Sequence, residues 1–470
     1  MSEKKLWSGR FSDSLNPDAL DFSSSPEDFK LFKHDIVGSI AHAGGLRRAR
    51  LLTPQEFAEI KTGLAAIYRE NASDPGLFLK GEEDVHMAVE SRLTAMLPVA
   101  GQKLHTARSR NDQIALDLRL YVREQTSETA RMVAALQKTL LNVARAHRRT
   151  AMPSYTHLQR AQPVFLSHHM LAHFWRFERD FDRLRGNGRR MDVSPLGAGA
   201  IAGTSHPIDT RYTAELLGFS RPFSNSMDAT SDRDFVIDAC FANAMLGLHL
   251  SSIAEEMVLW SSAEFSYIEL PDSLSTGSSI MPHKKNPDMA EHIRGKSSSL
   301  FSALFEVMSI LKSLPVGYAS DMQHTKRPLF RSFDTLSSML SMVSALLTGV
   351  RFNSEALRLS ASDDFSFSVE AVDMLVRAGM PFREAHETVG RAVKASLDSG
   401  RSLRETLSEQ GTILPAGASE AIEMRSSRGG SSSARITEQL RDAAEALAAE
   451  QAWVRRETGR LSSIERRLLR

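Results

Sequence analysis

The longest amphipathic pattern in the chain lies between Gly101 and Pro153, and no other glycine or proline interrupts this span. Apolar positions recur there every three or four residues with charged residues between them, which is the spacing of one helix face. The positions that carry the pattern are Met132, Leu136, Leu140, Val143 and His147. With Asn111 and Asp112 as the N-cap and Pro153 ending the element, the pattern predicts a helix from 111 to about 149, roughly 55 Å long.

Four further segments have the same helical pattern, and short stretches rich in glycine, proline and serine separate them. These segments cover residues 165–184, 228–265, 288–314 and 329–347. Because the expected helices are long and strand-like alternation is scarce, the pattern predicts an all-α protein with a central bundle of long helices. This bundle region, residues 108–360, is flanked by an N-terminal segment, 1–107, and a C-terminal helical segment, 361–470.

The composition sets limits on size, partners and compartment. A chain of 470 residues with 42% hydrophobic residues exceeds a single core of ordinary size, so more than one domain is expected. Its 58 Lys+Arg and 57 Asp+Glu give a formal charge of +1, a balance that disfavours nucleic acid or an anionic membrane as partner. The single cysteine, Cys240, excludes an intramolecular disulfide. Since there is neither a signal-peptide pattern nor an apolar run of membrane-spanning length, the sequence predicts a cytoplasmic protein.

Two polar segments mark the ends of expected helices. The first, LHTARSRNDQ at residues 104–113, places Arg108, Arg110 and Asn111 at the start of the longest helix, which suits a carboxylate or phosphate ligand. Taken alone, this segment fits a capped helix with solvated arginines better. The second, MPSYTHLQRAQP at residues 152–163, places Thr156 and His157 at an expected helix junction. A histidine is the side chain that exchanges protons most readily near neutral pH.

Two more polar segments follow further along the chain. TGSSIMPHKKNPDMAEHIRGK, residues 276–296, combines small residues, hydroxyls and lysines directly before a helix. Its candidate residues are Ser278, Lys284, Asn286 and Glu291. GYASDMQHTKRP, residues 317–328, gathers polar side chains outside any apolar pattern. Its candidate residues are Tyr318, Asp321, Gln323 and Lys326.

Motifs of several other enzyme classes are missing from the sequence. The chain has no G-x-S-x-G elbow, no Walker P-loop, no G-x-G-x-x-G after a strand and no Cys/His zinc spacing. His169 and His173 are four residues apart on an expected helix and could share a metal ion. Because no carboxylate stands beside them in an H-E-x-x-H pattern, the sequence favours a plain helix face over a metal site.

Taken together, the polar segments resemble one known group of enzymes. GSSIMPHKKNP resembles the signature loop of the fumarase/aspartase superfamily, here residues 276–288. Six further segments resemble the argininosuccinate lyase family in particular: WSGRF, EEDVHMAVE, KLHTARSRNDQIALDLRL, YTHLQRAQP, NSMDATSDRDF and GMPFREAHETVGRAV. The resemblance implies a three-domain, mostly helical subunit and a homotetramer whose active sites are shared between subunits. It also implies elimination of fumarate from argininosuccinate to give arginine, with no cofactor and no metal.

The resemblance also implies roles for single residues. Ser278 corresponds to the catalytic serine, on a mobile loop that closes over substrate, and Lys284 would stabilise the developing negative charge. His157 corresponds to the second catalytic group, with Glu291 as the carboxylate that orients it. Either Ser278 or His157 could remove the carbon-bound proton, and we favour Ser278. The implied substrate-binding residues are Ser24, Arg110, Asn111, Thr156, Asn286, Tyr318, Gln323 and Lys326, with Asp84 and His86 as additional lining residues.

The segment at residues 317–328 departs from the family pattern, and two alternatives follow. Different residues stand at positions 319, 320, 324, 325 and 327, while His283 and Ala107 replace a usual glutamine and glycine. Because this segment would face the amine half, a related lyase acting on another N-substituted aspartate is one alternative. A non-catalytic, crystallin-like structural protein is the other. The presence of Ser278, His157, Lys284 and Glu291 favours catalysis, since a scaffold has no physical need for them.

Overall fold

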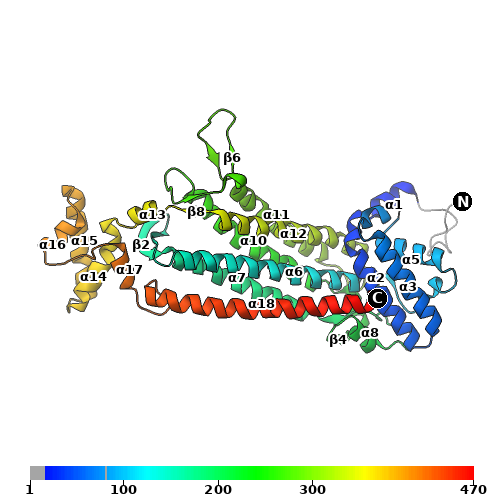
Figure 1. Cartoon of the computed structure of the whole chain (residues 1–470). Coiled ribbons are helices and arrows are strands. Elements are labelled where there is room, and N and C mark those ends of the chain that lie inside the picture. The colour runs from blue at the N-terminus through cyan, green and yellow to red at the C-terminus, as the bar shows by residue number, and fades with distance from the viewer. Residues whose placement is uncertain (1–15, 80–81) are drawn as a thin grey trace.

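Five long helices lie side by side along the molecule and form its central bundle (Figure 1). They are α6 (Arg110–Ala146), α7 (Leu166–Arg190), α10 (Asp234–Trp260), α11 (Asp288–Leu311) and α12 (Lys326–Gly349). The computed structural model describes residues 16–79 and 82–470, so the segment WSGRF at residues 7–11 lies outside the described residues. The predicted all-α fold with a bundle of long helices is confirmed.

The longest of these helices, α6, begins and ends a few residues away from the prediction. Its N-cap is Ser109, whose hydroxyl accepts the Asn111 N–H at 3.3 Å, while the Ser109 N–H donates to the Asp112 carboxylate at 2.9 Å. This reciprocal capping box corrects the predicted N-cap at Asn111 and Asp112. The helix ends at Ala146, before Pro153 is reached, so proline does not terminate it.

A β-hairpin takes the place of the expected helix junction after α6. Strands β1 (Ala151–Thr156) and β2 (Gln159–Phe165) pair antiparallel, with Pro153 opposite Pro163. Prolines are rare in paired strands because they lack a backbone donor, and they hid the strand pattern in the sequence. The described residues contain three further two-stranded sheets, β3–β4, β5–β8 and β6–β7, whose strands are Val193–Ser194, Arg221–Pro222, Ile268–Glu269, Arg351–Phe352, Thr276–Gly277 and Lys285–Asn286.

The helix predicted over residues 228–265 is two helices, α9 (Ser226–Ser231) and α10. Asp232 separates them because its backbone is extended (φ −62°, ψ 125°) and its carboxylate accepts the Asp234 N–H at 2.8 Å. Asp232 thus accepts the first backbone N–H of α10 from the position before the N-cap, Arg233, and the extended backbone there keeps the two helices separate. Arg119 of α6 also donates to the Asp232 carboxylate, which fixes the break against the bundle.

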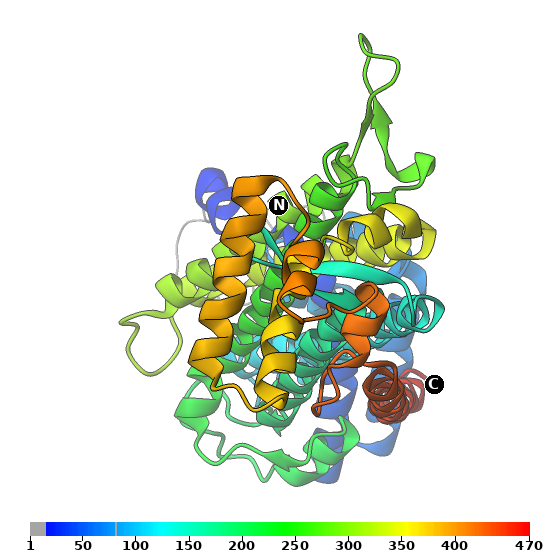
Figure 2. The same ribbon diagram turned by 90° about the vertical axis from the view of Figure 1, so that its left-hand side faces the viewer.

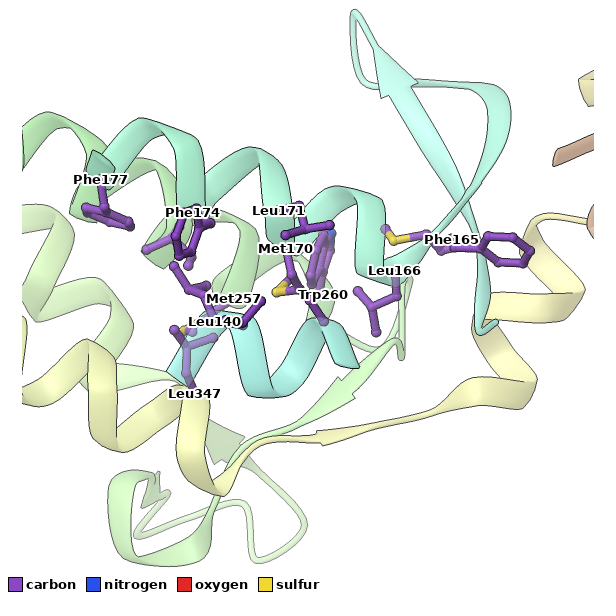
Figure 3. Close-up of a cluster of buried hydrophobic side chains, with 14 of the residues drawn as sticks. Leu140, Phe165, Leu166, Met170, Leu171, Phe174, Phe177, Met257, Trp260 and Leu347 are labelled. Carbon is purple, nitrogen blue, oxygen red and sulfur yellow. The ribbon is translucent and has the colours of Figure 1, made fainter. Parts of the chain in front are cut away.

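A continuous apolar core holds the bundle together, and Figure 3 shows part of it. Phe174 and Phe177 of α7 face Met257 of α10 and Leu347 of α12, and all four are at most 3% exposed. Burying a side chain of this size contributes about 1.5–3 kcal/mol each. Helices α10 and α11 approach closely at Gly247, where an added Cβ would come within 2.5 Å of a leucine methyl on α11. The core therefore sets the spacing of the helices that carry the candidate site.

Shorter helices cover both ends of the bundle. The N-terminal group consists of α1 (Pro17–Ser23), η2 (Pro26–Leu31), α2 (Phe32–Arg48), α3 (Pro54–Asn71), α4 (Pro75–Phe78), α5 (Val85–Met96) and η3 (Gly101–Lys103). The opposite end, which faces the viewer in Figure 2, carries α13 (Ser354–Ser360), η6 (Asp364–Phe367), α14 (Ser368–Arg377), α15 (Phe382–Ser399), α16 (Leu403–Glu409) and α17 (Ala418–Glu423). Connecting segments contain α8 (Thr210–Leu216), η4 (Asp272–Leu274) and η5 (Ser320–Thr325).

The last helix, α18 (Ser433–Leu469), runs back along the whole bundle beside α6 and α7 (Figure 1). Its buried residues belong to two cores: Leu440 and Leu447 join the bundle core, whereas Ile464 and Leu468 pack in the N-terminal core. The division of the chain at residues 107 and 360 stays a prediction, but by its packing α18 belongs with the bundle and not with α14–α17.

Helix α10 is the most apolar of the long helices. Among the described helices it alone is long and apolar enough to cross a membrane, and 61% of its most apolar window is already buried inside the chain. A buried core helix of a bundle has the same composition. Cys240 lies on this helix and is fully buried, and burial raises the pKa of its thiol to about 12. It therefore behaves as a small core residue and not as a reactive thiol.

Candidate active site

The turn of the β1–β2 hairpin presents His157. Thr156 pairs with Gln159, so His157 and Leu158 form a two-residue turn with positive φ at both positions, 56° and 57°. This conformation favours asparagine and glycine, and other residues adopt it at a cost of about 1–2 kcal/mol each. Strain of this kind is typical of functional sites. Both Thr156 and His157 are exposed, and the hairpin lies at the end of the bundle away from α1–α5 (Figure 1).

Hydrogen bonds and core packing hold the strands of the hairpin against the bundle. The Tyr155 and Tyr267 hydroxyls lie 2.5 Å apart, and the Ser154 hydroxyl donates to the Gln162 carbonyl at 2.6 Å. Met152 and Phe165, at the far end of the strands from the turn, are buried in the bundle core. His157 therefore lies at the turn of a hairpin whose strands are anchored in the bundle core.

The loop between β6 and β7 carries Ser278 and projects away from the bundle in two perpendicular views (Figures 1 and 2). The Ser278 Oγ accepts backbone N–H groups from Ile280 at 3.3 Å and Met281 at 3.0 Å. Hydrogen bonds donated to an oxygen stabilise its anionic form, so this turn supports a serine that must lose its proton. The geometry is suited to a serine base.

The two neighbouring lysines of this loop have different surroundings. Lys285 is 2.6 Å from the Asp272 carboxylate and 3.5 Å from that of Glu269, so its charge is compensated. For Lys284, which is exposed, no ion pair is found within residues 16–79 and 82–470. Asn286 closes the loop, since its amide donates to the Thr276 hydroxyl and the Gly277 carbonyl, both at 3.3 Å. Lys284 is therefore the lysine whose charge remains available to a ligand.

Glu291, at the start of α11, lies 3.8 Å from Arg294, which in turn bonds to Glu255. Its carboxylate is half exposed. No contact joins Glu291 to His157 within the described chain, so the orienting role remains a prediction.

A cavity of about 630 Å³ lies at the other end of the bundle, between η2, the start of α5, the start of α6 and η5. It brings together six of the predicted substrate-binding residues: Ser24, Arg110, Asn111, Tyr318, Gln323 and Lys326. Gln323 donates to the Tyr318 hydroxyl, and burial raises the pKa of that hydroxyl. Residues from three separate sequence segments thus line one site.

Charged pairs determine the electrostatics of this cavity. Lys326, only 3% exposed, donates to the fully buried Asp28 at 2.6 Å. Arg110 lies 3.9 Å from both Asp84 and Glu90. Although burial raises it, His86 and Arg110 hold the pKa of Asp84 below its usual value. Each cation is therefore balanced by an acid within the wall of the cavity.

His86 does not line the cavity, which corrects the prediction. It is fully buried, with Nδ1 2.9 Å from Asp35 and 3.3 Å from Asp117. His86 is only two residues from Asp84 in the sequence, but the two side chains lie in different surroundings. Asp84 lines the cavity, whereas His86 is buried. His86 instead joins a buried charge cluster that anchors α5 to α2 and α6.

Two acids make contacts near the cavity that the sequence did not reveal. Asp28 is needed because a buried lysine requires a counter-charge. The only indication in the sequence was its position in FSSSPEDF, four residues after the candidate Ser24. Asp112 accepts the N–H groups of Gly197 and Gly199 at 3.1 and 2.9 Å and so fixes the loop that Asn111 also contacts, at the Ala200 carbonyl. Nothing in the local sequence shows that long-range contact.

The predicted catalytic residues and the cavity are far apart within one chain. The cavity lies at the start of α6, whereas the hairpin follows its end, and the 37 residues between span roughly 55 Å. The Ser278 loop leaves the bundle at a third place (Figure 1). The structure therefore groups the substrate-binding residues but not the catalytic ones.

Residues 18–301 match the family model described as "Lyase", and residues 365–426 match that of the "Argininosuccinate lyase C-terminal". The chain therefore matches this class of lyases over most of its length. The chain is 45% identical to argininosuccinate lyase of Symbiobacterium thermophilum over 94% of its length and 98% of the relative's, and 46% identical to that of Gloeothece citriformis over 88% and 91%. The chain belongs to the argininosuccinate lyase family.

Solved structures agree on the fold. EDDS lyase in complex with formate has a TM-score of 0.84 at 27% identity, covering 97% of this chain and 95% of that one. The class II fumarase of Schistosoma mansoni has a TM-score of 0.72 at 14% identity, covering 83% and 88%, and shows the shared fold alone. The predicted fumarase/aspartase-like fold is confirmed.

Proposed function

We propose that this protein is a carbon–nitrogen lyase that cleaves argininosuccinate to fumarate and arginine, as its curated relatives are named for doing. The observation that carries the proposal is the cavity at the start of α6, where groups for both halves of such a substrate meet. Arg110 and Asn111 bind the carboxylates of the succinyl half. Tyr318, Gln323 and Lys326 bind the amino-acid half, with Ser24 as a further contact.

The first chemical step removes a proton from the carbon next to a carboxylate. Ser278, as an alkoxide, takes this proton, and its two backbone N–H donors together with the uncompensated Lys284 stabilise the required anion. The electrons move into the neighbouring carboxylate, which becomes doubly charged before the C–N bond breaks. Lys284 and Asn286 stabilise that charge, because fixed cations and donors act most strongly where charge develops.

The second step breaks the C–N bond and gives the leaving nitrogen a proton. His157 supplies it directly or through a water, and Glu291 orients the imidazole. Thr156 binds the carboxylate of the product fumarate beside it. A strained turn that holds His157 at the tip of the hairpin is the feature that supports this role.

These groups meet only if several subunits contribute, so the proposal includes a homotetramer with shared active sites. The chain belongs to a family whose members form oligomers. An unpartnered apolar stripe on the bundle supports this assembly: Phe305 of α11 is 74% exposed, and the remaining members are Phe241, Leu248, Phe301 and Met308. These residues recur at helical spacing on the adjacent helices α10 and α11. A stripe of this kind on a bundle marks a protein interface, and another bundle of the same chain fits it.

The surroundings of Arg327 favour argininosuccinate over a more anionic substrate. Its side chain is 75% exposed and lies 3.5 Å from Glu27 at the rim of the cavity, so it does not repel a guanidinium inside. Adenylosuccinate would need several cations for its phosphate, whereas the buried Lys326 is already paired with Asp28. The second candidate function is that of a lyase acting on another N-substituted aspartate, and the structural similarity to EDDS lyase supports it.

A fumarate-release assay tests the proposal. The purified protein is given argininosuccinate, adenylosuccinate and a panel of other N-substituted aspartates, and kcat/KM is compared between them. We expect argininosuccinate to give the highest value. A clear preference for another N-substituted aspartate would support the second candidate, and absence of fumarate from every substrate would support a crystallin-like structural role. We further propose that the protein is cytoplasmic, like a soluble enzyme of amino-acid metabolism.

A further inference from the structure

Two histidines of α7 and one glutamate of α10 converge on a single point outside the proposed active site. The Nε2 atoms of His169 and His173 lie 2.7 and 2.9 Å from the same oxygen of Glu256, Oε2. One ligand atom from each of the three residues lies within 4.8 Å of the other two. The sequence lacked a carboxylate beside these histidines, and the fold supplies it from a neighbouring helix.

We propose that His169, His173 and Glu256 form a binding site for a zinc-class divalent cation. Two histidines one helical turn apart and a carboxylate from another helix are a ligand set that zinc proteins use, with water in the fourth position. Borderline-soft divalent ions prefer imidazole nitrogen combined with carboxylate oxygen, whereas magnesium and calcium prefer oxygen alone. The three side chains therefore select for zinc or cobalt over magnesium.

Side-chain rotations would bring the three ligand atoms, which already lie within 4.8 Å of one another, to the spacing that such an ion needs. Zinc–ligand bonds of about 2.0–2.1 Å at tetrahedral angles place neighbouring ligand atoms about 3.3–3.4 Å apart. The two nitrogen–oxygen distances must then open by roughly 0.5 Å, within reach of a rotation of the Glu256 side chain. The two imidazole rings pack edge-on, with an interplanar angle of 60° and centroids 5.3 Å apart.

The surroundings give the ion an enclosed side and an open side. The His173 side chain is 4% exposed, while those of His169 and Glu256 are 24% and 29% exposed. A cation could enter from solvent and keep a water ligand there. His173 Nδ1 is buried with no partner among the described residues, so the support that a second hydrogen bond gives a ligand histidine is missing. We therefore expect a dissociation constant on the order of micromolar, weaker than in structural zinc sites.

The position of the site indicates what a bound cation would do. Helix α7 begins directly after β2, so His169 lies in the first turn beyond the hairpin that carries His157. Its ring packs against Trp260 near the end of α10, at 5.0 Å between centroids. A cation bound by all three residues would tie α7 to α10 and stabilise the support of the hairpin without touching the proposed reacting groups.

The test uses the untagged full-length protein after treatment with a chelator. Zinc binding is measured by equilibrium dialysis with metal counted per chain, and cobalt binding by the visible absorption bands of tetrahedral Co²⁺. Glu256→Gln keeps the shape of the side chain but replaces a charged ligand by a weak one. His173→Phe removes a buried ligand and retains a ring of similar size. His168→Ala is the matched control, because it removes the adjacent histidine, whose hydrogen-bond partner is Gln439, and keeps all three proposed ligands.

We expect the wild type and His168→Ala to bind about one zinc per chain and to melt at a higher temperature when zinc is present. Both Glu256→Gln and His173→Phe should weaken binding roughly ten-fold or more. If His173→Phe does not fold, the zinc affinity of Glu256→Gln alone tests the proposal. No saturable binding by the wild type, unchanged binding by Glu256→Gln, or an equal loss in His168→Ala would each overturn the proposal.

Discussion

Lys326 and Asp28 form a buried ion pair, 2.6 Å apart, in the wall of the 630 Å³ cavity. Lys326 could stabilise the fold by pairing with Asp28, and it could also bind a carboxylate of the substrate. The two roles can be separated by removing the charges of Lys326 and Asp28 together and measuring both stability and KM.

Lys326→Met should lower the free energy of unfolding by about 3–5 kcal/mol, since it leaves the Asp28 carboxylate buried and unpaired. It should also raise KM for the substrate by roughly ten-fold or more, because the substrate loses one charge-assisted hydrogen bond. The double variant Asp28→Asn/Lys326→Met should recover most of the stability but not the KM. Recovery of both would mean that Lys326 is purely structural. Arg327→Gln, the exposed neighbour, is the control and should change the unfolding free energy by less than about 1 kcal/mol.

Ser278→Ala should abolish turnover while the circular-dichroism signal and melting temperature stay close to wild type. The hydroxyl lies in a projecting loop, where it accepts two backbone N–H groups and packs against no core. Single-turnover and steady-state rates of fumarate release provide the measurement. Ser279→Ala, the adjacent serine, is the matched control and should remain active. Retention of more than a few per cent of the wild-type rate by Ser278→Ala would rule out an essential acid or base at this position.

Ala107→Gly should stabilise the protein. Ala107 has φ 62°, the left-handed region that favours glycine. Relief of about 1–2 kcal/mol of strain is partly offset by about 0.5–1 kcal/mol of added chain entropy in the unfolded state. The expected net gain is therefore about 0.5–1 kcal/mol, measured by thermal or denaturant unfolding. A loss of stability would show that the methyl group contributes packing that outweighs the strain.

The attachment of α18 to the bundle should weaken as pH rises. Burial raises the pKa of Glu450 to about 7 from a usual 4.5, Glu178 adds to the rise, and Gln137 and Arg185 oppose it. A carboxyl whose pKa is raised by folding stabilises the fold below its unfolded pKa and loses that contribution as pH rises through the folded value. The free energy of unfolding should therefore fall between pH 5 and pH 8 more steeply for wild type than for Glu450→Gln, by an amount on the order of 1–3 kcal/mol, and the melting temperature should fall with it. Parallel pH profiles would contradict this.

The long helices were predictable because their stability depends on a repeating apolar face that the sequence displays directly. Met132, Leu136 and Leu140 follow one another at helical spacing, and the helix they predict was found to within a few residues. The hairpin at His157 was not predictable by the same reasoning, because Pro153 and Pro163 interrupt its strands. The break at Asp232 depends on a hydrogen bond from the Asp234 N–H to its carboxylate and on Arg119, which is distant in sequence.

The candidate site was predictable in its parts but not in its arrangement. Polar segments at helix ends identified Arg110, Tyr318 and Lys326, and the cavity brings them together. Asp28 and Glu256 escaped notice because their partners lie on other helices, and helix packing cannot be read from local spacing.

The central claim is that His157 and Ser278 of different subunits complete one active site. To test it, His157→Ala and Ser278→Ala chains are denatured, mixed in equal amounts and refolded, and mixed oligomers are confirmed by mass spectrometry. With random mixing, about a quarter of the sites receive both intact residues, so about a quarter of refolded wild-type activity should return, although each variant refolded alone is inactive. No recovery in confirmed mixed oligomers would mean that both residues come from one chain, and would contradict the account.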